Sequence, residues 1–289
     1  MVSSTDPSAG TLFVVATPIG NIDDISLRAR TVLGEVALIA AEDTRHTGKL
    51  LSRLGITGKL LSCHEHNEVA RIPQILDCLR CGGDVALVSD AGTPLLSDPG
   101  FRVLQAAVAE GILVSPVPGC SAALAALSVA ALPTDRVLFA GFIPASAGKR
   151  NASLRELADR AETLVLYESV HRIQATLKAI ADIFGSDRPV VAAREMTKLH
   201  ETLYRGSVAE VLVQVEADTG SSKGEYTLVI AGAEPVAATT IELDRVLKIL
   251  LGYLGVRQSA EAAARILDVK KRDAYQRALD LRESTDDQF

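Results

Sequence analysis

Residues 85–110 have the sequence VALVSDAGTPLLSDPGFRVLQAAVAE, and the fold prediction starts from them. The apolar, β-branched run 85–89 predicts a buried strand, and the apolar spacing of 100–110 predicts a helix. The loop between them is Ser89-Asp90-Ala91-Gly92-Thr93-Pro94-Leu95-Leu96-Ser97-Asp98-Pro99-Gly100. Its small residues let a ligand approach the backbone amides, and the helix N-terminus that follows favours an acceptor or anion. We therefore predict a ligand loop at the carboxyl end of a strand, with a tight structural connection as the alternative.

The same alternation of strand and helix extends in both directions. Strands are predicted at 12–17, 37–41, 60–63, 85–89 and 112–116, with helices at 26–33, 45–54, 72–79 and 100–110. This rhythm predicts a mostly parallel sheet with helices on both faces. A second series has helices at 121–131, 153–161, 171–184 and 208–215, a loop at 144–149, and strands at 137–142, 164–168, 190–194, 201–205 and 226–231. Because its last strands lack long crossovers, the second sheet is predicted to be mixed.

The chain divides into four predicted parts. Residues 1–10 are rich in small and polar residues, lack the features of a signal peptide, and are predicted to be a disordered tail. An N-terminal α/β domain is predicted over 11–117 and a C-terminal α/β domain over 118–234. Residues 240–285 have only helical periodicity, with helices expected at 243–254, 260–267 (capped by Ser259) and 272–281. The short final turn is typical of a helix-turn-helix module.

Composition limits the class of protein. The chain has 289 residues, of which 48% are hydrophobic and 23% charged, as in ordinary globular proteins. No apolar run is long enough to span a membrane. The net charge of −6 argues mildly against a nucleic-acid partner, but residues 240–282 hold nine Lys and Arg against six Asp and Glu, a net charge of +3. The Cys78-x-x-Cys81 pair has no second pair of ligands, so we expect reduced thiols in the cytoplasm and no metal.

Polar side chains gather where two of the predicted strands end. Glu42, Asp43 and Arg45 follow the second strand; they are suited to a substrate site or to capping the next helix. His64 and His66 end the third strand and, by alternation, are expected to share one side of it. A metal would need a third ligand there, so a polar rim for a substrate is favoured. The chain lacks the dinucleotide-binding G-x-G-x-x-G and the Walker loop.

Several of these stretches resemble one family. Residues 89–100 match the S-D-A-G-x-P-x-[LIV]-[SN]-D-P-G motif of the ribosomal RNA small-subunit methyltransferase I family. Residues 16–21, 41–45, 64–68, 118–122, 167–172 and 224–228 resemble further stretches of that family in the same order. The resemblance covers about 12–232, and the helical tail is similar to the family's C-terminal helix-turn-helix.

The resemblance implies a two-domain tetrapyrrole-methylase-like (class III methyltransferase) fold and a homodimer that holds S-adenosylmethionine in the cleft between domains. It implies 2′-O-methylation of a cytidine in 16S ribosomal RNA, with the RNA or the small ribosomal subunit as partner. Thr93 stands where tetrapyrrole methylases have an aspartate, so Asp90 is expected to meet the cofactor's amino group instead. The residues expected to line the cofactor pocket are Pro18, Asp90, Ala91, Gly92, Thr93, Leu96, Ser121, Ala122 and Tyr167.

Methyl transfer to a 2′-hydroxyl is helped by a nearby group that accepts the hydroxyl proton, and we expect Asp43 or Glu168 to be that group. Arg45 and His64 are expected to hold phosphate or sugar. The cations expected to contact RNA phosphates from the last helix are Lys271, Arg272 and Arg277. Packing or dimerisation is the alternative role for that helical part. Two other functions remain open from the sequence: a small-molecule (tetrapyrrole-type) methyltransferase, and a non-enzymatic, ligand-sensing DNA-binding regulator.

Overall fold

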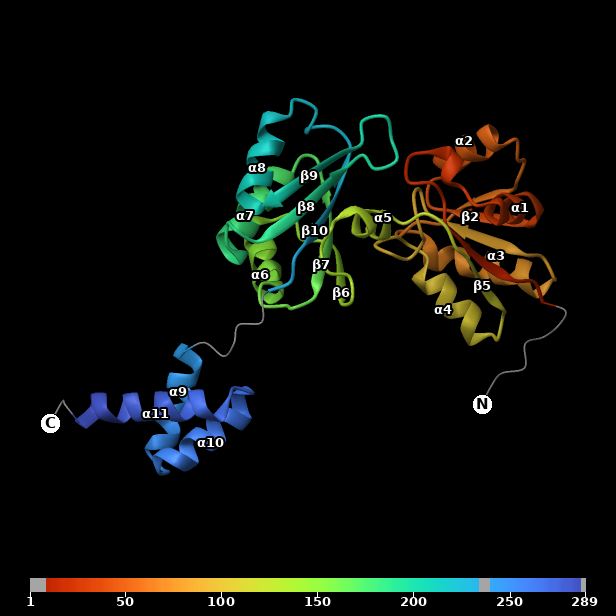
Figure 1. The fold of residues 1–289 in the computed structure, drawn as a ribbon. Coiled ribbons are helices and arrows are strands. Elements are labelled where there is room, and N and C mark those ends of the chain that lie inside the picture. The colour runs from red at the N-terminus through yellow and green to blue at the C-terminus, as the bar shows by residue number, and fades with distance from the viewer. Residues whose placement is uncertain (1–8, 234–239, 287–289) are drawn as a thin grey trace. The chain divides into compact units, whose positions relative to one another are not determined.

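The computed structural model describes residues 9–233 and 240–286. The chain forms two compact units, residues 1–232 and residues 233–289, which are described separately (Figure 1). Over the described residues, the first unit contains two five-stranded sheets, and the second contains three helices.

The first sheet has the strand order β3-β2-β4-β1-β5, and all its pairings are parallel, which confirms the predicted parallel sheet. Its strands are β1 (Leu12–Val15), β2 (Leu38–Ala41), β3 (Leu60–Ser62), β4 (Val85–Val88) and β5 (Val114–Val117). The helical elements that connect them are η1 (Ile22–Asp24), α1 (Leu27–Glu35), α2 (Thr44–Leu54), α3 (Glu68–Arg80) and α4 (Phe101–Ala109).

Both faces of this sheet are covered. In β2, Leu38 and Ala40 belong to the apolar cluster that includes the buried side of α3 and α4. Ile39 and Ala41 belong to the cluster on the opposite face, with α1 and α2. Because successive strand residues point to opposite faces, a strand buried on both sides is apolar throughout, and this explains the uninterrupted apolar runs of the sequence.

The second sheet has the order β6-β7-β10-β8-β9. Only the β6–β7 pairing is parallel and the other three are antiparallel, so the prediction of a mixed sheet is confirmed. Its strands are β6 (Val137–Phe142), β7 (Thr163–Ser169), β8 (Pro189–Arg194), β9 (Thr202–Ser207) and β10 (Glu225–Ile230). Helix α5 (Ala122–Val129) packs on one face, and α6 (Ala147–Leu157), α7 (Ile173–Phe184) and α8 (Val208–Ala217) pack on the other.

Two helices of the first unit begin well before the predicted residue. Helix α6 begins at Ala147, inside the stretch 144–149 that is predicted to be a loop, because the fully buried Leu154 anchors it to the sheet. Helix α3 begins at Glu68 rather than at residue 72. The buried Glu68 carboxylate accepts hydrogen bonds from the backbone amides of Arg102 (2.5 Å) and Val103 (3.0 Å), so it joins α3 to the start of α4. Such tertiary anchors leave no local signal in the sequence.

The second unit consists of α9 (Thr240–Leu251), α10 (Val256–Leu267) and α11 (Lys271–Asp286), packed around a small core that includes Leu247, Ala260 and Ala274. The predicted Ser259 cap is wrong: Gly255 is the N-cap of α10, and Ser259 is buried inside its first turn, where its hydroxyl bonds the Leu254 carbonyl. Within 9–233 and 240–286, no helix combines the length and apolarity needed to cross a membrane.

Candidate functional site

The site begins at two neighbouring strands, β1 and β4, after which the chain continues toward opposite edges of the sheet. From β1 the chain passes β4 to reach β2, and from β4 it passes β1 to reach β5. Such a switch point opens a crevice at the carboxyl ends of the strands, where ligands bind in open α/β sheets. The loops after β1 and β4 meet there through paired backbone bonds between Thr17 and Gly92 (2.9 and 3.0 Å).

The loop at residues 89–100 is held in an unusual backbone conformation. Gly92 and Gly100 have φ of 79° and 117°, and Leu95 and Ser97 have φ of 76° and 72°. Positive φ costs a residue with a side chain of the order of 1–3 kcal/mol, and such strain concentrates at functional sites. A Cβ on Gly100 would lie 2.7 Å from Leu87 Cδ2, so glycine is also required sterically at the start of α4.

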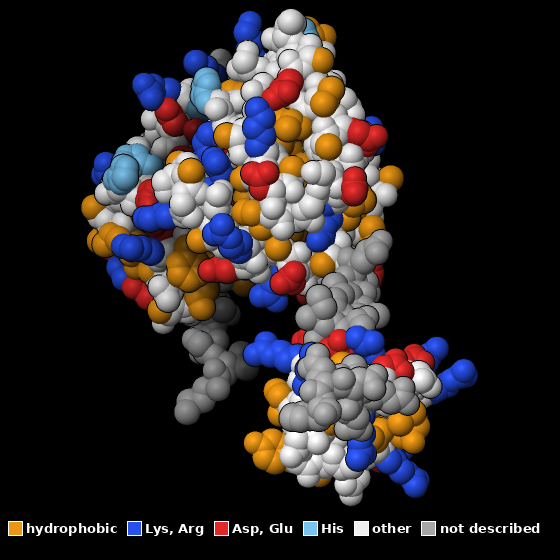
Figure 2. All heavy atoms as spheres, turned by 90° about the vertical axis from the view of Figure 1, so that its left-hand side faces the viewer, with side chains coloured by type: hydrophobic (Ala, Val, Ile, Leu, Met, Phe, Trp, Pro, Cys, Tyr) orange, Lys and Arg blue, Asp and Glu red, His pale blue; other side chains and the backbone are white. Residues whose placement is uncertain are grey.

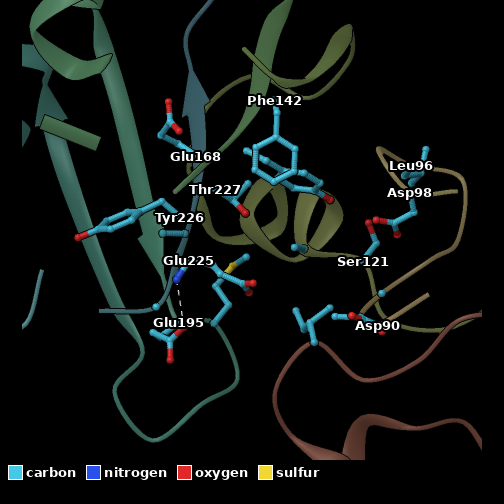
Figure 3. Close-up of a pocket in the computed structure, with 18 of the residues that line it drawn as sticks. Asp90, Leu96, Asp98, Ser121, Phe142, Glu168, Glu195, Glu225, Tyr226 and Thr227 are labelled. Atoms are coloured by element: carbon cyan, nitrogen blue, oxygen red, sulfur yellow. Dashed lines mark hydrogen bonds between the residues drawn. The ribbon is translucent and has the colours of Figure 1, made fainter. Parts of the chain in front are cut away.

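A pocket of about 350 Å³ lies beyond this loop, between it and the second sheet. Eight of the nine residues predicted to line a cofactor pocket line it, and Pro18 does not; its neighbour Ile19 takes that place. Figure 3 shows Asp90, Asp98 and Ser121 on one side of the pocket and Glu195 and Glu225 on the other. Lining residues absent from the prediction include Glu42, Asp98, Phe142, Glu195, Met196, Lys198 and Thr227.

Three carboxylates converge on one side of the pocket. The Asp90 amide donates to Glu42 Oε2 (3.2 Å), and the Asp43 amide donates to Asp90 Oδ1 (3.1 Å). Asp98 lines the same pocket, and the charges of Glu42 and Asp90 act on its titration. Burial raises the pKa of Glu42, although the hydrogen bond from the Asp90 amide acts to lower it. This side of the pocket therefore favours a cationic ligand.

Asp98 is the most strongly perturbed of these acids. Burial raises its pKa to about 6, a hydrogen bond with Ser89 opposes the rise, and the neighbouring charges of Glu42 and Asp90 add to it. A carboxyl group poised near neutral pH in a pocket is suited to accept a proton during a reaction.

Aromatic side chains form another part of the wall. Tyr167 on β7 packs edge-on against Phe139 (ring centroids 5.1 Å apart) and at a tilt against Phe142 (5.5 Å). Burial raises the pKa of Tyr167, opposed by hydrogen bonds with the Ala123 backbone and the Ser121 side chain. Ser121 also caps α5, as predicted, by accepting from the Leu124 amide. The second sheet is thereby joined to the start of α5.

Asp43 and Arg45 do not line the pocket. Asp43 is the N-cap of α2 and forms an ion pair with Arg45, with Arg45 Nη2 and Nε at 2.7 and 3.1 Å from its carboxylate. The hydrogen bonds from Arg45 hold the pKa of Asp43 well below its usual range. The capping alternative is thus confirmed, and a carboxylate of such low basicity is a poor proton acceptor.

His64 also lies outside the pocket lining. The expectation that His64 and His66 share one side of a strand is wrong: β3 ends at Ser62, and the two rings sit in the turn that follows, 6.0 Å apart and edge to face. The turn is fixed by Asn67, whose Oδ1 accepts from the His64 amide at 2.8 Å. No cluster of three or more His, Cys, Asp or Glu suited to a metal occurs in the described part of the chain.

Glu168 lines the pocket but is engaged on several sides. Its carboxylate accepts from the Thr176 hydroxyl (2.6 Å) and the Ser169 amide (2.8 Å), and Arg172 Nε lies 3.2 Å away. The side chain is only 1% exposed. These partners give Glu168 a role in holding β7 against α7.

The cations predicted on the last helix differ in their surroundings. Arg277 forms a double hydrogen bond with Asp244 (2.6 and 2.7 Å), and Lys271 bonds Glu261 (2.7 Å). Arg272 is exposed and has no ion-pair partner within residues 9–233 and 240–286. Figure 2 shows Lys and Arg side chains interspersed with Asp and Glu on the displayed face of the first unit. Among the three cations, Arg272 is therefore the most available for a phosphate.

Some of the missed residues had a sequence signal and some had none. Asp98 belongs to the same motif as Asp90, and Glu42 adjoins Asp43, so both stood in stretches already singled out. Lys198 lies in the β8–β9 connection, a region with no recognisable motif. It reaches the pocket only through the pairing of β8 with β10.

Comparison with known proteins agrees with this architecture. Residues 11–212 match the model of the Tetrapyrrole (Corrin/Porphyrin) Methylases, and residues 237–282 match the RsmI C-terminal HTH domain. Among solved structures, uroporphyrin-III-C-methyltransferase from Thermus thermophilus aligns with a TM-score of 0.55 at 22% identity, over 77% of this chain and 94% of that one. The methyltransferase CobJ aligns with a TM-score of 0.58 at 18% identity, over 78% and 95%. At such identities these structures show the fold.

Relatives with higher identity include proteins named ribosomal RNA small subunit methyltransferase I. The protein of that name from Pseudomonas aeruginosa is 48% identical over 94% of this chain and 98% of its own length. Those from Escherichia coli O157:H7 and Synechocystis sp. are 43% and 41% identical, over 96% and 94% of this chain and 97% and 98% of their own. The chain therefore belongs to the ribosomal RNA small subunit methyltransferase I family, within the tetrapyrrole methylases.

Proposed function

We propose that this protein transfers a methyl group from S-adenosylmethionine to the 2′-hydroxyl of a cytidine in 16S ribosomal RNA. The observation that carries the proposal is the pocket at the β1–β4 switch point, which gathers the loop 89–100, the start of α5 and Tyr167 in a chain of this family. We further propose that it works in the cytoplasm as a homodimer, with the 16S RNA or the small subunit as its partner.

The pocket suits S-adenosylmethionine on chemical grounds. The cofactor carries a sulfonium and an ammonium, and the side of the pocket formed by Glu42, Asp90 and Asp98 favours positive charge. Small residues at Ala91 and Gly92 let a ligand reach backbone groups, and the φ of 79° at Gly92 favours glycine there. Asp90 is our candidate for the partner of the amino group, as the Thr93 substitution in the motif suggests. Thr93 instead donates to the Cys120 carbonyl (3.0 Å).

When bound, the cofactor supplies an activated methyl group on a good leaving group. The work left to the protein is to bring the ribose oxygen into line with that methyl and to accept the hydroxyl proton. Asp43 and Glu168 are the acceptors proposed from sequence. We favour Asp98 over both, because it lines the pocket, whereas Asp43 does not and Glu168 already accepts hydrogen bonds from Thr176 and Ser169.

The helical unit is our candidate for holding the RNA outside the pocket. We propose that exposed cations of α11, foremost Arg272, contact phosphates, while Lys271 and Arg277 also hold the three helices together. Arg45 and His64 remain candidates for sugar or phosphate contacts at the edge of the first sheet.

The decisive experiment measures tritium transfer from methyl-labelled S-adenosylmethionine to small ribosomal subunits that lack this modification. Nuclease mapping should place the label on one cytidine ribose, and a 2′-deoxycytidine at that position should accept none. Label on a base, or on a tetrapyrrole but not on RNA, would replace this proposal with another methyl acceptor. Binding of DNA without any methyl transfer would favour the regulator instead.

A further inference from the structure

The connection between β8 and β9, residues 195–201, crosses to the loop after β1. The Asn21 amide donates to Thr197 Oγ1 at 3.1 Å. The stem of Lys198 lies against Gly20, where an added Cβ would stand 2.3 Å from Lys198 Cγ. Glu195 and Thr197 hold φ of 51° and 65°, which are strained values for residues with side chains. The connection is therefore held in a defined position at the pocket, where Glu195 and Lys198 line the wall.

Two glutamates hold the ammonium of Lys198 in place. Its Nζ lies 2.7 Å from Glu195 Oε1 and 3.6 Å from Glu225 Oε2. The same Glu195 oxygen accepts from the Glu225 amide at 3.1 Å. Gly224 leaves the room that the Glu195 side chain needs, because a Cβ there would stand 2.3 Å from Glu195 Cγ and Cδ. Two glycines on different loops thus accommodate this pair of side chains.

Charge makes Lys198 distinct within the pocket. Of the described residues that line it, six are carboxylates and Lys198 is the one Lys or Arg. Burial lowers the pKa of Lys198, but the hydrogen bond to Glu195 and the charges of Glu225 and Glu195 outweigh it and raise the pKa overall. Lys198 is therefore a permanent cation in a site that otherwise repels anions.

The two carboxylates around Lys198 are not equivalent. Glu195 is mostly buried and anchored by the backbone bond from Glu225, whereas the Glu225 side chain is 79% exposed and lies farther from the ammonium. Exposed ion pairs at such distances contribute little free energy. An incoming anion can displace Glu225 at low cost, while Glu195 keeps the ammonium in place.

We propose that Lys198 is a substrate-binding residue whose ammonium group contacts a phosphate of the nucleotide that is methylated. The inference rests on the proposed function, because it requires an RNA strand in the pocket. It divides the pocket by charge. The carboxylates Glu42, Asp90 and Asp98 face the cationic cofactor, and Lys198 meets the anionic substrate. Figure 3 shows Asp90 and Asp98 on one side of the pocket and Glu195 and Glu225, the partners of Lys198, on the other.

The test compares Lys198→Met, Lys198→Arg and the control Lys178→Met in methyl transfer to small subunits. Lys178 is matched because it also pairs with a glutamate, Glu216 at 2.9 Å, but lies on α7 and does not line the pocket. In Lys198→Met we expect the KM for subunits to rise about tenfold, while the Kd for S-adenosylmethionine stays within about twofold. The slope of log kcat/KM against log salt should shrink by about one, as for the loss of one phosphate contact. Lys198→Arg should retain most of the affinity, and Lys178→Met should behave as wild type.

Methyl transfer by the wild type and the KM of Lys198→Met report on the proposed function and on the phosphate contact separately. Wild-type protein that transfers no methyl group to subunits contradicts the proposed function, and this inference falls with it. An active wild type with an unchanged KM and salt slope in Lys198→Met contradicts only the phosphate contact. Weaker S-adenosylmethionine binding in both Lys198 variants would place the ammonium in the cofactor site and likewise overturn the inference.

Discussion

Glu42 and Asp90 lock the ends of β2 and β4 together: the Asp90 amide donates to the Glu42 carboxylate, and the Asp43 amide donates to the Asp90 carboxylate. Each carboxylate thus accepts a hydrogen bond from a backbone amide of the other loop. The arrangement keeps two negative charges side by side at the pocket, although they repel one another and the pKa of Glu42 is raised, chiefly by burial. A bound cation relieves that repulsion, so ligand binding and loop order should be coupled.

The Asp90→Asn variant tests this coupling. The amide oxygen can still accept from the Asp43 backbone, so the free energy of unfolding should change by less than about 1 kcal/mol. Loss of the charge should weaken S-adenosylmethionine binding about tenfold in calorimetry, by about 1.4 kcal/mol. Asp43→Asn, outside the pocket, is the control and should bind the cofactor as wild type does. Equal affinity in all three proteins would rule out Asp90 as a partner of the cofactor.

Asp98 should govern the pH dependence of methyl transfer. With a pKa of about 6, it is an acceptor only when deprotonated, so kcat should rise with pH through about 6 and level off above it. Asp98→Asn should lower single-turnover kcat by about 100-fold or more and remove this rise. A variant that keeps the wild-type rate and profile would exclude Asp98 as acceptor.

The ionised Asp98 carboxylate should lower the stability of the folded protein. The pKa of Asp98 is about 6 in the folded protein, against 3.8 for an ordinary aspartate. Between these values the folded state binds more protons than the unfolded state, so its stability falls as pH rises from about 4 to 6. At pH 7.5, Asp98→Asn should therefore unfold at equal or higher urea concentration than wild type, with a gain of about 1 kcal/mol. A marked loss of stability would show that the carboxylate is structurally required.

Glu168 is expected to matter for folding more than for chemistry. In Glu168→Gln the charge that faces Arg172 is lost inside the protein, which should lower the free energy of unfolding by about 3 kcal/mol in urea denaturation. Thr176→Val, which leaves the Arg172 pair intact, should cost less, about 1 kcal/mol. Full stability combined with loss of methyl transfer in Glu168→Gln would restore Glu168 as the proton acceptor.

Two glycines offer a matched test of the strained loop. Gly100 has φ of 117° and no room for a Cβ, so Gly100→Ala should destabilise the protein by about 2 kcal/mol and weaken cofactor binding. At Gly148, in helix α6, an added Cβ would meet no atom within 4 Å. Gly148→Ala should instead stabilise by up to about 1 kcal/mol in the same thermal melts. Similar behaviour of the two variants would contradict the assignment of strain to the loop.

The helical unit should contribute to RNA affinity and not to cofactor binding. Deletion of residues 238–289 should leave the Kd for S-adenosylmethionine unchanged and weaken binding to small subunits at low salt. Within the unit, Arg272→Gln should reduce the salt slope by about one. Arg277→Gln should chiefly destabilise the unit, because it breaks the two hydrogen bonds from the guanidinium to the Asp244 carboxylate. Unchanged subunit affinity in the truncated protein would favour a packing role for these helices.

Local patterns predicted the secondary structure well wherever burial is continuous. The strands of the first sheet were recognisable because both faces of the sheet are covered. The loop 89–100 was recognisable because its small residues, prolines and two aspartates disfavour both helix and strand. The prediction failed at α6, which is anchored by Leu154, and at Ser259, which is a buried helix residue rather than a cap. In both cases packing between distant elements outweighed a local preference.

By itself the amino-acid sequence determined the parallel and mixed sheets, the helical tail and the small-residue loop 89–100, because these depend on periodicity and on backbone freedom, which are local. Only the tertiary structure decided which charged groups meet in the pocket. Strand order placed Glu42 beside Asp90, burial gave Asp98 its raised pKa, and the pairing of β8 with β10 brought Lys198 to a site whose other charged residues are all acids. Proximity and desolvation arise from residues far apart in the chain, so no local pattern encodes them.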